Sequence, residues 1–280
     1  MPTEFDEIGL WSEVKLDIIR EYASAYTTIM RARQRDKISS LRWIYVDAYA
    51  GPGYHVSKTS GGLVEGSPLI ALNTEPPFYE YHFIDSDADR AKQLRKLAGS
   101  RTDVFIYSGD CNEVLRRDVF PRAQYSEYRR ALCLLDPYNI DLEWGILEAA
   151  GKSRSIDLFM NLMMMDINRN VLRKDPEKSI GSKKAQLTRL WGDESWKEAA
   201  YENTRSLFDE MIPSKVSNER FAEAFRQRLQ KKAGFKWVPR PMPMKNKDTL
   251  IYYLYFASQK EAGMDVVNYI FDKYRTRQGL

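Results

Sequence analysis

Cysteine and histidine are scarce in this sequence. The 280 residues include two cysteines, Cys111 and Cys133, which form no C-x-x-C pair, and two histidines, His55 and His82. So few soft ligands exclude a disulfide-built scaffold and the usual cysteine and histidine metal sites, so we expect no bound metal. Cysteines without a pairing pattern are typical of reduced thiols, which favours a cytoplasmic protein.

Long apolar runs are also absent. No stretch approaches the roughly 20 apolar residues that span a bilayer, and Glu4, Asp6 and Glu7 do not fit a signal peptide, so we expect no membrane partner. The formal net charge is +4, with 43% hydrophobic and 29% charged residues. This composition is that of a globular protein, and the slight positive charge permits a nucleic-acid partner without requiring one. The length suits one good core, so we expect a single domain over residues 1–280.

The most informative stretch is residues 41–53. Its first part, Trp43 to Val46, is apolar and rich in β-formers, which predicts a strand buried on both faces. The strand ends at Asp47 and gives way to Ala50-Gly51-Pro52-Gly53, where missing side chains let a backbone turn approach a ligand closely. A strand, an acid at its end and a small-residue turn describe the first crevice of a doubly wound α/β sheet.

Two common nucleotide loops do not fit this turn. The dinucleotide pattern G-x-G-x-x-G finds Val56 in place of its third glycine, and Ser57-Lys58-Thr59 lacks the glycine of a Walker A loop. What remains is Asp-x-x-x-Gly-x-Gly, which resembles the first motif of S-adenosylmethionine-dependent methyltransferases, particularly those that act on nucleic acids. The alternative is an ordinary glycine turn after a core strand.

Three further predicted strands also end near an acid. Residues 81–84 lead to Asp85, at the position where nucleotide-binding α/β units hold a ribose, while Asp87 is expected to cap the following helix. Residues 104–107 lead to Gly109-Asp110, which resembles the methyltransferase position that binds the adenine amino group. Asp110 or Asn112 as a simple helix cap is the alternative. The candidate cofactor-binding residues are Asp47, Tyr49, Ala50, Gly51, Gly53, Asp85, Asp110 and Cys111.

The fourth strand, residues 131–135, is uniformly apolar and therefore central. It runs into Asp136-Pro137-Tyr138-Asn139, which resembles the Asp/Asn-Pro-Pro-Tyr/Phe motif of amino-methyltransferases with one proline missing. In that motif the acid and a proline carbonyl accept hydrogen bonds from the target amino group, and the aromatic ring stacks on a flipped base. The candidate catalytic residues are thus Asp136, Pro137 and Tyr138. Candidates for holding the acceptor substrate are Lys15, Tyr54, His55 and Ser67.

The rest of the chain supplies helices and closing strands. We expect a helix over 11–34 capped by Ser12, a loose stretch over 56–65, and a helix capped by Ser67. Residues 168–234 are charged, with tryptophans, and predict a helical insertion or lid within the domain. A strand over 249–256 and a helix over 264–274 close the chain. The basic residues around Trp237 are expected to form a solvent-exposed face. The alternative is that they form a nucleic-acid-binding surface.

Taken together, these motifs resemble the three-Cys-motif partner protein (TcmP) family. The resemblance extends over most of residues 10–275, on Arg20-Glu21-Tyr22, the 47–53 loop, Gly66-Ser67-Pro68, Gly109-Asp110-Cys111-Asn112, Leu135-Asp136-Pro137-Tyr138, Leu190-Trp191-Gly192 with Trp196, and residues 250–258. It implies a Rossmann-like, mostly parallel sheet of the class I methyltransferase type and a partner protein with three cysteines. A more distant likeness to ribosomal-RNA adenine-N6 methyltransferases favours nucleic acid as substrate.

The leading hypothesis is therefore a methyltransferase that uses S-adenosylmethionine as cofactor and modifies a nucleic-acid base. One alternative is a binding module of the same fold that holds the three-cysteine partner without catalysis. The other is a metal-dependent nuclease, which rests on the clustered acids alone.

Overall fold

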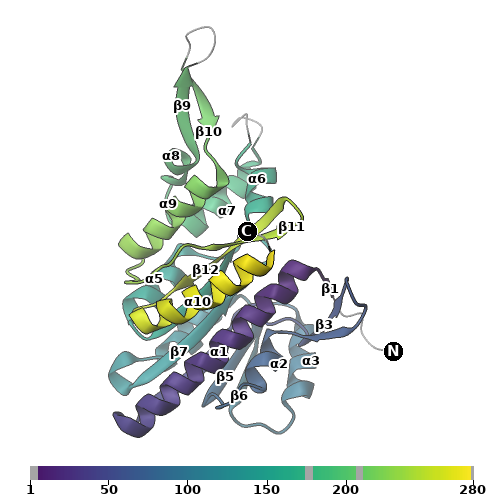
Figure 1. Ribbon diagram of the computed structural model, residues 1–280, viewed down its shortest axis with the longest axis vertical. Coiled ribbons are helices and arrows are strands. Elements are labelled where there is room, and N and C mark those ends of the chain that lie inside the picture. The colour runs from purple at the N-terminus through teal and green to yellow at the C-terminus, as the bar shows by residue number, and fades with distance from the viewer. Residues whose placement is uncertain (1–5, 174–178, 206–210, 279–280) are drawn as a thin grey trace.

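A sheet of seven strands forms the centre of the computed structural model, which describes residues 6–173, 179–205 and 211–278 (Figure 1). Its strand order is β11 (Met242–Asn246), β12 (Thr249–Ala257), β8 (Ile156–Leu162), β7 (Arg129–Leu135), β2 (Arg42–Asp47), β5 (Glu80–Asp85) and β6 (Val104–Ser108). The pairs from β8 to β6 are parallel, whereas β12 is antiparallel to both of its neighbours. This confirms the predicted fold class, a doubly wound sheet of the class I methyltransferase type.

The order of the strands reverses between β2 and β7. After β2 the chain adds β5 and β6 on one side, and it then crosses to add β7 and β8 on the other. Such a reversal opens a crevice outside the carboxyl ends of the two central strands, where ligands bind in sheets of this kind. β7 occupies the middle of the seven strands, as its apolar sequence predicts.

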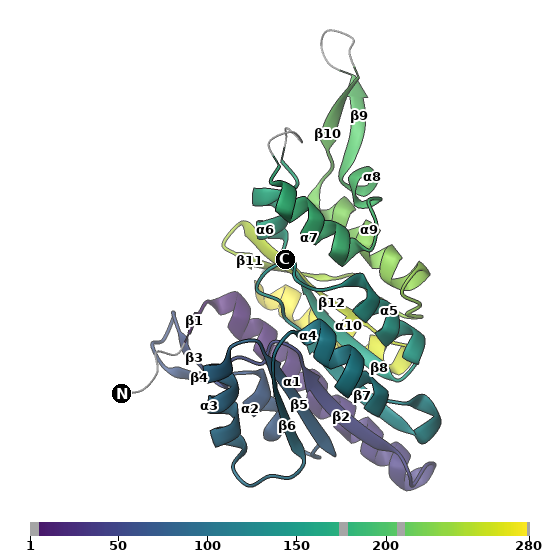
Figure 2. The same ribbon diagram turned by 180° about the vertical axis from the view of Figure 1, so that it is seen from behind.

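Helices cover both faces of the sheet (Figures 1 and 2). On one face lie α1 (Leu10–Asp36) and α10 (Glu261–Gln278), and on the other lie α4 (Cys111–Val114) and α5 (Trp144–Ser153). Trp43 and Tyr45 of β2 pack in the core with α1, and Ile44 and Val46 in the core with α5. The alternation confirms that this strand is buried on both faces.

Two predicted helix caps are wrong. The N-cap of α1 is Gly9, which leaves room for the Trp11 ring, and Ser12 lies inside the helix with its amide donating to the Gly9 carbonyl at 2.9 Å. The N-cap of α2 (Ser67–Leu72) is Gly66, not Ser67. The Gly66 amide donates to Gly53 O at 2.7 Å, and a Cβ on Gly66 would lie 2.9 Å from that oxygen. Close backbone approach therefore decides the second cap. By contrast, Asp87 caps α3 (Ala88–Ala98) as predicted.

Residues 56–65 were expected to be loose, but both ends of this stretch lie in short strands. β3 (Tyr54–Ser57) pairs with β4 (Leu63–Glu65) and, on its other side, with β1 (Glu7–Ile8). The prediction is wrong here because the N-terminal partner, far away in sequence, supplies the backbone hydrogen bonds. Short helical turns at Leu115–Val119, Phe120–Arg122 and Tyr125–Glu127 lead from α4 to β7.

The segment predicted as a helical insertion also contains strands. It includes the end of α6 (Met164–Asn170) and the whole of α7 (Gly181–Trp191), α8 (Trp196–Ala200) and α9 (Asn218–Lys231). However, β9 (Tyr201–Arg205) and β10 (Met211–Lys215) form an antiparallel pair between α8 and α9. This pair projects from the top of the molecule in Figure 1. The predicted insertion also includes residues 174–178 and 206–210, which lie outside the described residues.

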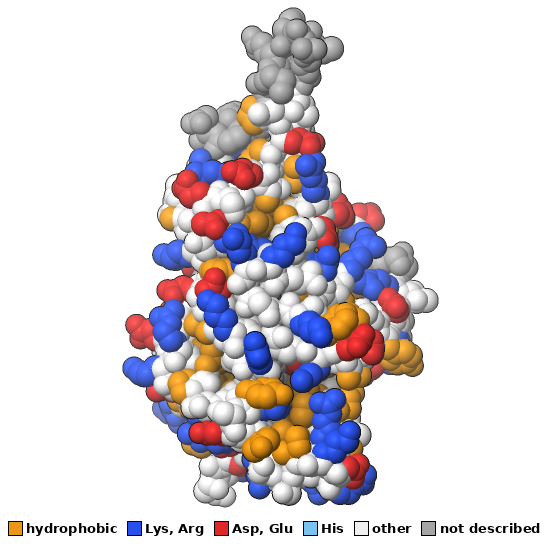
Figure 3. All heavy atoms as spheres, turned by 90° about the vertical axis from the view of Figure 1, so that its left-hand side faces the viewer, with side chains coloured by type: hydrophobic (Ala, Val, Ile, Leu, Met, Phe, Trp, Pro, Cys, Tyr) orange, Lys and Arg blue, Asp and Glu red, His pale blue; other side chains and the backbone are white. Residues whose placement is uncertain are grey.

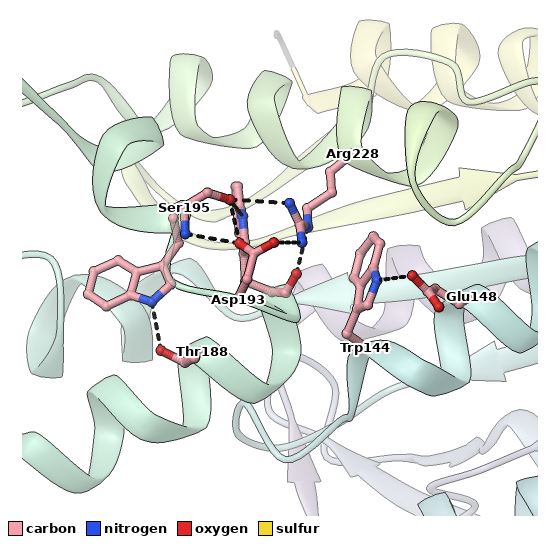
Figure 4. A network of polar contacts seen from close by, with 8 residues as sticks. Trp144, Glu148, Thr188, Asp193, Ser195 and Arg228 are labelled. Carbon is pink, nitrogen blue, oxygen red and sulfur yellow. Dashed lines mark hydrogen bonds and ion pairs between the residues drawn. The ribbon is translucent and has the colours of Figure 1, made fainter.

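Tryptophans and one arginine fasten this segment to α5 (Figure 4). The Arg228 guanidinium of α9 lies over the rings of Trp144 and Trp191, with its Cζ 4.7 and 5.6 Å from their centroids. It also donates to Asp193 Oδ2 at 2.6 Å. Trp144 donates to Glu148 at 2.8 Å, and Trp196 donates to Thr188 at 2.8 Å. The Leu-Trp-Gly and Trp196 elements of the sequence thus build this junction.

Candidate functional site

The four strand-end acids lie along one edge of the sheet. Asp47 is the last residue of β2, Asp85 is the last of β5, and Asp136 directly follows β7. Asp110 follows β6 as the N-cap of α4. Because these strands are parallel and adjacent, their carboxyl ends meet at the switch point between β2 and β7.

The glycine loop after β2 is pinned to β5. Gly51 and Gly53 have φ angles of +67° and +93°, in the left-handed region that favours glycine. The Ala50 amide donates to the Ile84 carbonyl, and the Gly51 amide donates to Asp85 Oδ2, both at 2.9 Å. The loop is therefore held beside the crevice by the neighbouring strand.

Asp47 lies beneath this loop and not on a cavity wall. Its side chain is fully buried, Oδ1 accepts the Tyr49 amide at 3.3 Å, and Oδ2 has no hydrogen-bond partner among the described residues. Burial, with the nearby Asp136 charge as a smaller cause, raises the pKa of Asp47 to about 7. Asp47 therefore lines neither of the two cavities of the site, although a direct contact with a methionine end was expected, whereas Ala50 and Gly51 of the loop do line a cavity.

Asp85 is also committed to the backbone. Its Oδ2 accepts from Gly51, its Oδ1 accepts the Asp87 amide at 2.8 Å, and the residue is buried. The next residue, Ser86, lines the cavity instead. The structure therefore places the predicted ribose acid behind the wall, with its oxygens fixing the two loops.

A cavity of about 440 Å³ opens beside Asp110. Asp110 Oδ1 accepts the Asn112 and Glu113 amides at 2.8 and 3.2 Å, so the capping alternative is confirmed while the residue still lies on the wall. The Cys111 thiol donates to the Tyr49 hydroxyl at 3.0 Å, and burial raises its pKa to about 11, so it remains a neutral wall group. We name this hollow the Asp110 cavity. Its wall includes residues that the sequence did not single out for it, namely Ser86, Asp141, Glu143 and Arg189.

A second hollow of about 150 Å³, the Lys15 cavity, adjoins the first. Both share Tyr49, Pro137 and Tyr138 as lining residues. The second also has among its walls the predicted residues Lys15, Ala50, Gly51, His55, Ser67 and Asp136. Tyr54 and Gly53 line neither cavity, because Tyr54 opens β3 and Gly53 contacts the α2 start through its carbonyl.

Asp136 is held from two sides inside the Lys15 cavity. The Lys15 ammonium pairs with Oδ2, and the Asn161 amide nitrogen donates to Oδ1. Lys15 is buried in α1 and Asn161 in β8. His55 stands nearby, and burial lowers its pKa, which keeps its imidazole neutral at pH 7. The sequence offered no signal for Asn161 beyond its place in a buried strand.

Tyr138 is an exposed aromatic between the two cavities. Its side chain is 61% exposed, yet its hydroxyl accepts from Arg90 at 3.1 Å, and Arg90 also pairs with Asp6 at 2.8 Å. A held but solvent-facing ring can stack on a planar ligand. Arg90 was missed by the sequence analysis because α3 alone does not reveal that it reaches across to Tyr138.

The described residues contain neither a metal-binding cluster nor a membrane-spanning helix. No group of three or more histidines, cysteines, aspartates or glutamates in them could hold a metal ion. No helix in the same ranges is long and apolar enough to cross a membrane.

Comparison with known proteins gives structural likeness only. No protein-family model and no curated protein matches the sequence. Among solved structures, the chain resembles protein LPL1258 from Legionella pneumophila strain Philadelphia 1, of family model DUF519, at 11% identity and a TM-score of 0.50 over 93% of this chain and 91% of that one. At this identity the likeness concerns the fold.

Two methyltransferase structures align less closely. The DszA carbon methyltransferase has 16% identity and a TM-score of 0.43, over 87% of this chain and 54% of that one. The plantazolicin methyltransferase BamL, solved with a substrate analogue and SAH, has 10% identity and a TM-score of 0.35, over 89% and 88%.

Proposed function

We propose that this protein is a cytoplasmic S-adenosylmethionine-dependent methyltransferase that modifies an amino group of a nucleic-acid base. The observation that carries the proposal is the pair of adjoining cavities at the strand-order reversal, which share Tyr49, Pro137 and Tyr138. A methyl transfer needs one space for the donor and one for the acceptor, meeting at a common boundary, and this arrangement supplies both.

The residues of the first cavity suit the cofactor. Ser86 beside Asp85 would hold its ribose, and Asp110 its adenine amino group. Its methionine end would extend past the shared Tyr49 to the Ala50 and Gly51 backbone, which lines the adjoining Lys15 cavity. The fit is supported by the volume of about 440 Å³. When bound, the cofactor supplies an electrophilic methyl group on a sulfonium.

The residues of this protein would contribute to the reaction by aligning the target amino group with the methyl donor. Lys15 and Asn161 fix the Asp136 carboxylate, which would accept a hydrogen bond from the target amino group, as would the Pro137 carbonyl. Tyr138 would stack on the base, which must leave its duplex or loop to reach this depth. Such positioning can supply much of a rate enhancement without acid–base chemistry.

The cofactor assignment is tested by calorimetric titration with S-adenosylhomocysteine. The wild-type protein should bind it, and Asp110→Asn should bind about tenfold more weakly because a carboxylate acceptor is lost. Asp87→Asn is the matched control, since Asp87 is an N-cap of the same type on α3 outside the cavity wall and asparagine caps equally well. It should bind within about twofold of wild type. Absence of binding by the wild-type protein would remove the proposal.

A second candidate function is a non-catalytic module that binds a three-cysteine partner protein. The observation that favours it is the Asp136 carboxylate, which is already engaged by Lys15 and Asn161, beside a motif that lacks one proline. Membership of the TcmP family belongs to this proposal too, and rests on the order of the sequence motifs. Asp136→Asn distinguishes the candidates. An enzyme should lose transfer of a radiolabelled methyl group to RNA or DNA while still binding S-adenosylhomocysteine, whereas a binding module shows no transfer in either form.

A further inference from the structure

A small pocket lies at the opposite edge of the sheet from the two cavities. It is enclosed by the second half of α1, the start of α10 and the amino ends of β7 and β8. Figure 3 faces the side of the molecule where the end of α1 and the start of α10 lie, and blue Lys and Arg side chains are spread over it among orange hydrophobic ones. The residues that line it include Tyr22, Tyr26, Arg33, Arg130, Arg154, Asp157, Lys260 and Gly263.

Four of these residues are cations without an acidic partner. In the described ranges, no salt bridge joins Arg33, Arg130, Arg154 or Lys260 to a carboxylate, although most arginines elsewhere on the molecule have one. Arg130 donates to the backbone oxygens of Tyr125 and Arg129 and lies over the Tyr125 ring. Burial lowers the pKa of Arg130, and the nearby positive charge of Arg33 lowers it further. Cations that repel one another and form no ion pair favour a bound anion.

Asp157 is the one carboxylate among these lining residues, and hydroxyl groups occupy both of its oxygens. Oδ2 accepts from Tyr22 at 2.9 Å, and Oδ1 accepts from Ser258 at 2.6 Å. Its single charge leaves the four cations in excess.

The Tyr26 hydroxyl gives an independent sign of a missing ligand. Tyr26 is 4% exposed, its hydroxyl has no hydrogen-bond partner among the described residues, and it lines the pocket. Leaving a buried polar group without a partner costs about 1–3 kcal/mol. An oxygen-rich ligand in the pocket would accept this hydrogen bond and remove the cost.

The size of the pocket limits what can enter. Its volume is about 40 Å³, and one water needs roughly 10–15 Å³ on this measure, so about three waters or one phosphate-sized group fit. At Gly263 a Cβ would lie 3.0 Å from the Tyr22 hydroxyl, so a side chain there would be packed tightly against it. The 18-residue helix α10 begins beside the pocket, and its positive end adds to the attraction for an anion.

We propose that this pocket binds a phosphate-sized oxyanion through Arg33, Arg130 and the Tyr26 hydroxyl, with Arg154 and Lys260 at its rim. The site is separate from the Asp110 and Lys15 cavities and does not depend on the function proposed for them. The anion is either free phosphate or the terminal phosphate of a nucleic acid.

The test is calorimetric titration with inorganic phosphate at pH 7.5 in chloride buffer of constant ionic strength. Wild type should bind with a Kd in the millimolar range or below, and Arg33→Gln should weaken binding at least tenfold. Arg31→Gln is the matched control, because it removes the same charge from an exposed position on the same helix outside the pocket. It should change the Kd less than twofold. No binding by wild type, or equal losses in both variants, overturns the proposal.

Tyr26→Phe tests the pocket without removing a charge. It deletes only a hydroxyl without a partner, so the free protein should be at least as stable, while phosphate binding should weaken about threefold to tenfold. An unchanged Kd overturns the role of the hydroxyl.

A dinucleotide with and without a 5′-phosphate then identifies the source of the anion. A nucleic-acid end is supported if only the phosphorylated dinucleotide binds, if it binds more tightly than inorganic phosphate, and if Arg33→Gln weakens this binding. Free phosphate is supported if the phosphorylated dinucleotide binds more weakly than inorganic phosphate.

Discussion

The carboxyl group of Asp47 is held in an environment that disfavours its charge. It is fully buried below the glycine loop, and its pKa is raised from 3.8 to about 7, chiefly by burial. The folded protein therefore keeps a proton on Asp47 over a pH range in which the unfolded chain has lost it. By linkage, the free energy of unfolding falls as pH rises through this range.

We predict that Asp47→Asn removes part of this pH dependence. Between about pH 4 and 7 the wild-type protein should lose on the order of 4 kcal/mol through Asp47, at about 1.4 kcal/mol per pKa unit. Asparagine carries no charge and can still accept the Tyr49 amide. Urea unfolding of both proteins at pH 5 and pH 7 measures the difference. Asp157, with a pKa of about 6, acts in the same direction in both proteins and so cancels. Equal pH dependence in the two would contradict the prediction.

At the level of single residues, the sequence predicted which acids lie together at the strand ends. It did not predict which hydrogen bonds their carboxylate oxygens accept. The apolar runs before Asp47, Asp85 and Asp136 identify strand ends, and parallel pairing then brings the acids to one edge. The path of the loop between Asp47 and Gly53 depends on left-handed glycines and on a bond from β5. Those long-range contacts put Asp85 behind the wall, and no local pattern in the sequence reveals them.

The junction between α7 and α5 depends on a glycine. Gly192 ends α7 with a φ of +94°, and a Cβ there would lie 2.6 Å from the Trp144 ring, over which Arg228 stacks. The position thus combines a backbone conformation that L-residues avoid with close ring packing. We propose that residues 168–234 are an insertion within a single domain, and the contacts at this junction support that proposal.

We predict that Gly192→Ala destabilises the protein by about 1–3 kcal/mol, because the backbone strain and the clash with Trp144 both oppose the folded state. Gly181→Ala is the control, since Gly181 lies in the same helix with no atom within 4 Å of its added Cβ. Alanine should leave stability unchanged or raised by up to about 1 kcal/mol there. Urea unfolding measures both, and an equal effect of the two substitutions would refute the role of the junction.

Among the elements, the apolar strands of the central sheet were predicted, whereas its edge strand β11 and the small strand pairs were not. β2, β5, β7, β8 and β12 are apolar enough to be recognised alone. β3 and β9 are polar and short, and each becomes a strand only because a partner lies beside it. A core strand can be recognised from its apolar sequence, whereas a polar surface strand forms only where another strand pairs with it.

Across the whole molecule, α1 reaches from one proposed site to the other. Lys15 contacts Asp136 near its start, and Arg33 lines the anion pocket near its end. The 18 intervening steps of a helix that rises 1.5 Å per residue separate them by about 27 Å. The helix is continuous from Leu10 to Asp36, and its apolar residues from Ile18 to Met30 pack in the core beside the sheet, so we expect it to behave as a rigid element.

We therefore predict that the two sites bind independently. The Kd for inorganic phosphate should stay within about twofold when S-adenosylhomocysteine saturates the Asp110 cavity. By reciprocity, the same should hold for the cofactor product when phosphate is present. Paired calorimetric titrations measure both constants. A change of fivefold or more in either would show coupling and would contradict a rigid α1.

β12 and α10 complete the sheet and the helical layer to which β8 and α1 belong. β12 pairs with β8, and α10 packs beside α1, where Lys273 forms an ion pair with Glu21 at 2.6 Å. Until residues 249–278 fold, β8 has no neighbour on its outer side and part of the apolar face of α1 is unpacked. The core therefore closes only when segments far apart in the sequence meet, and long-range contacts of this kind slow folding.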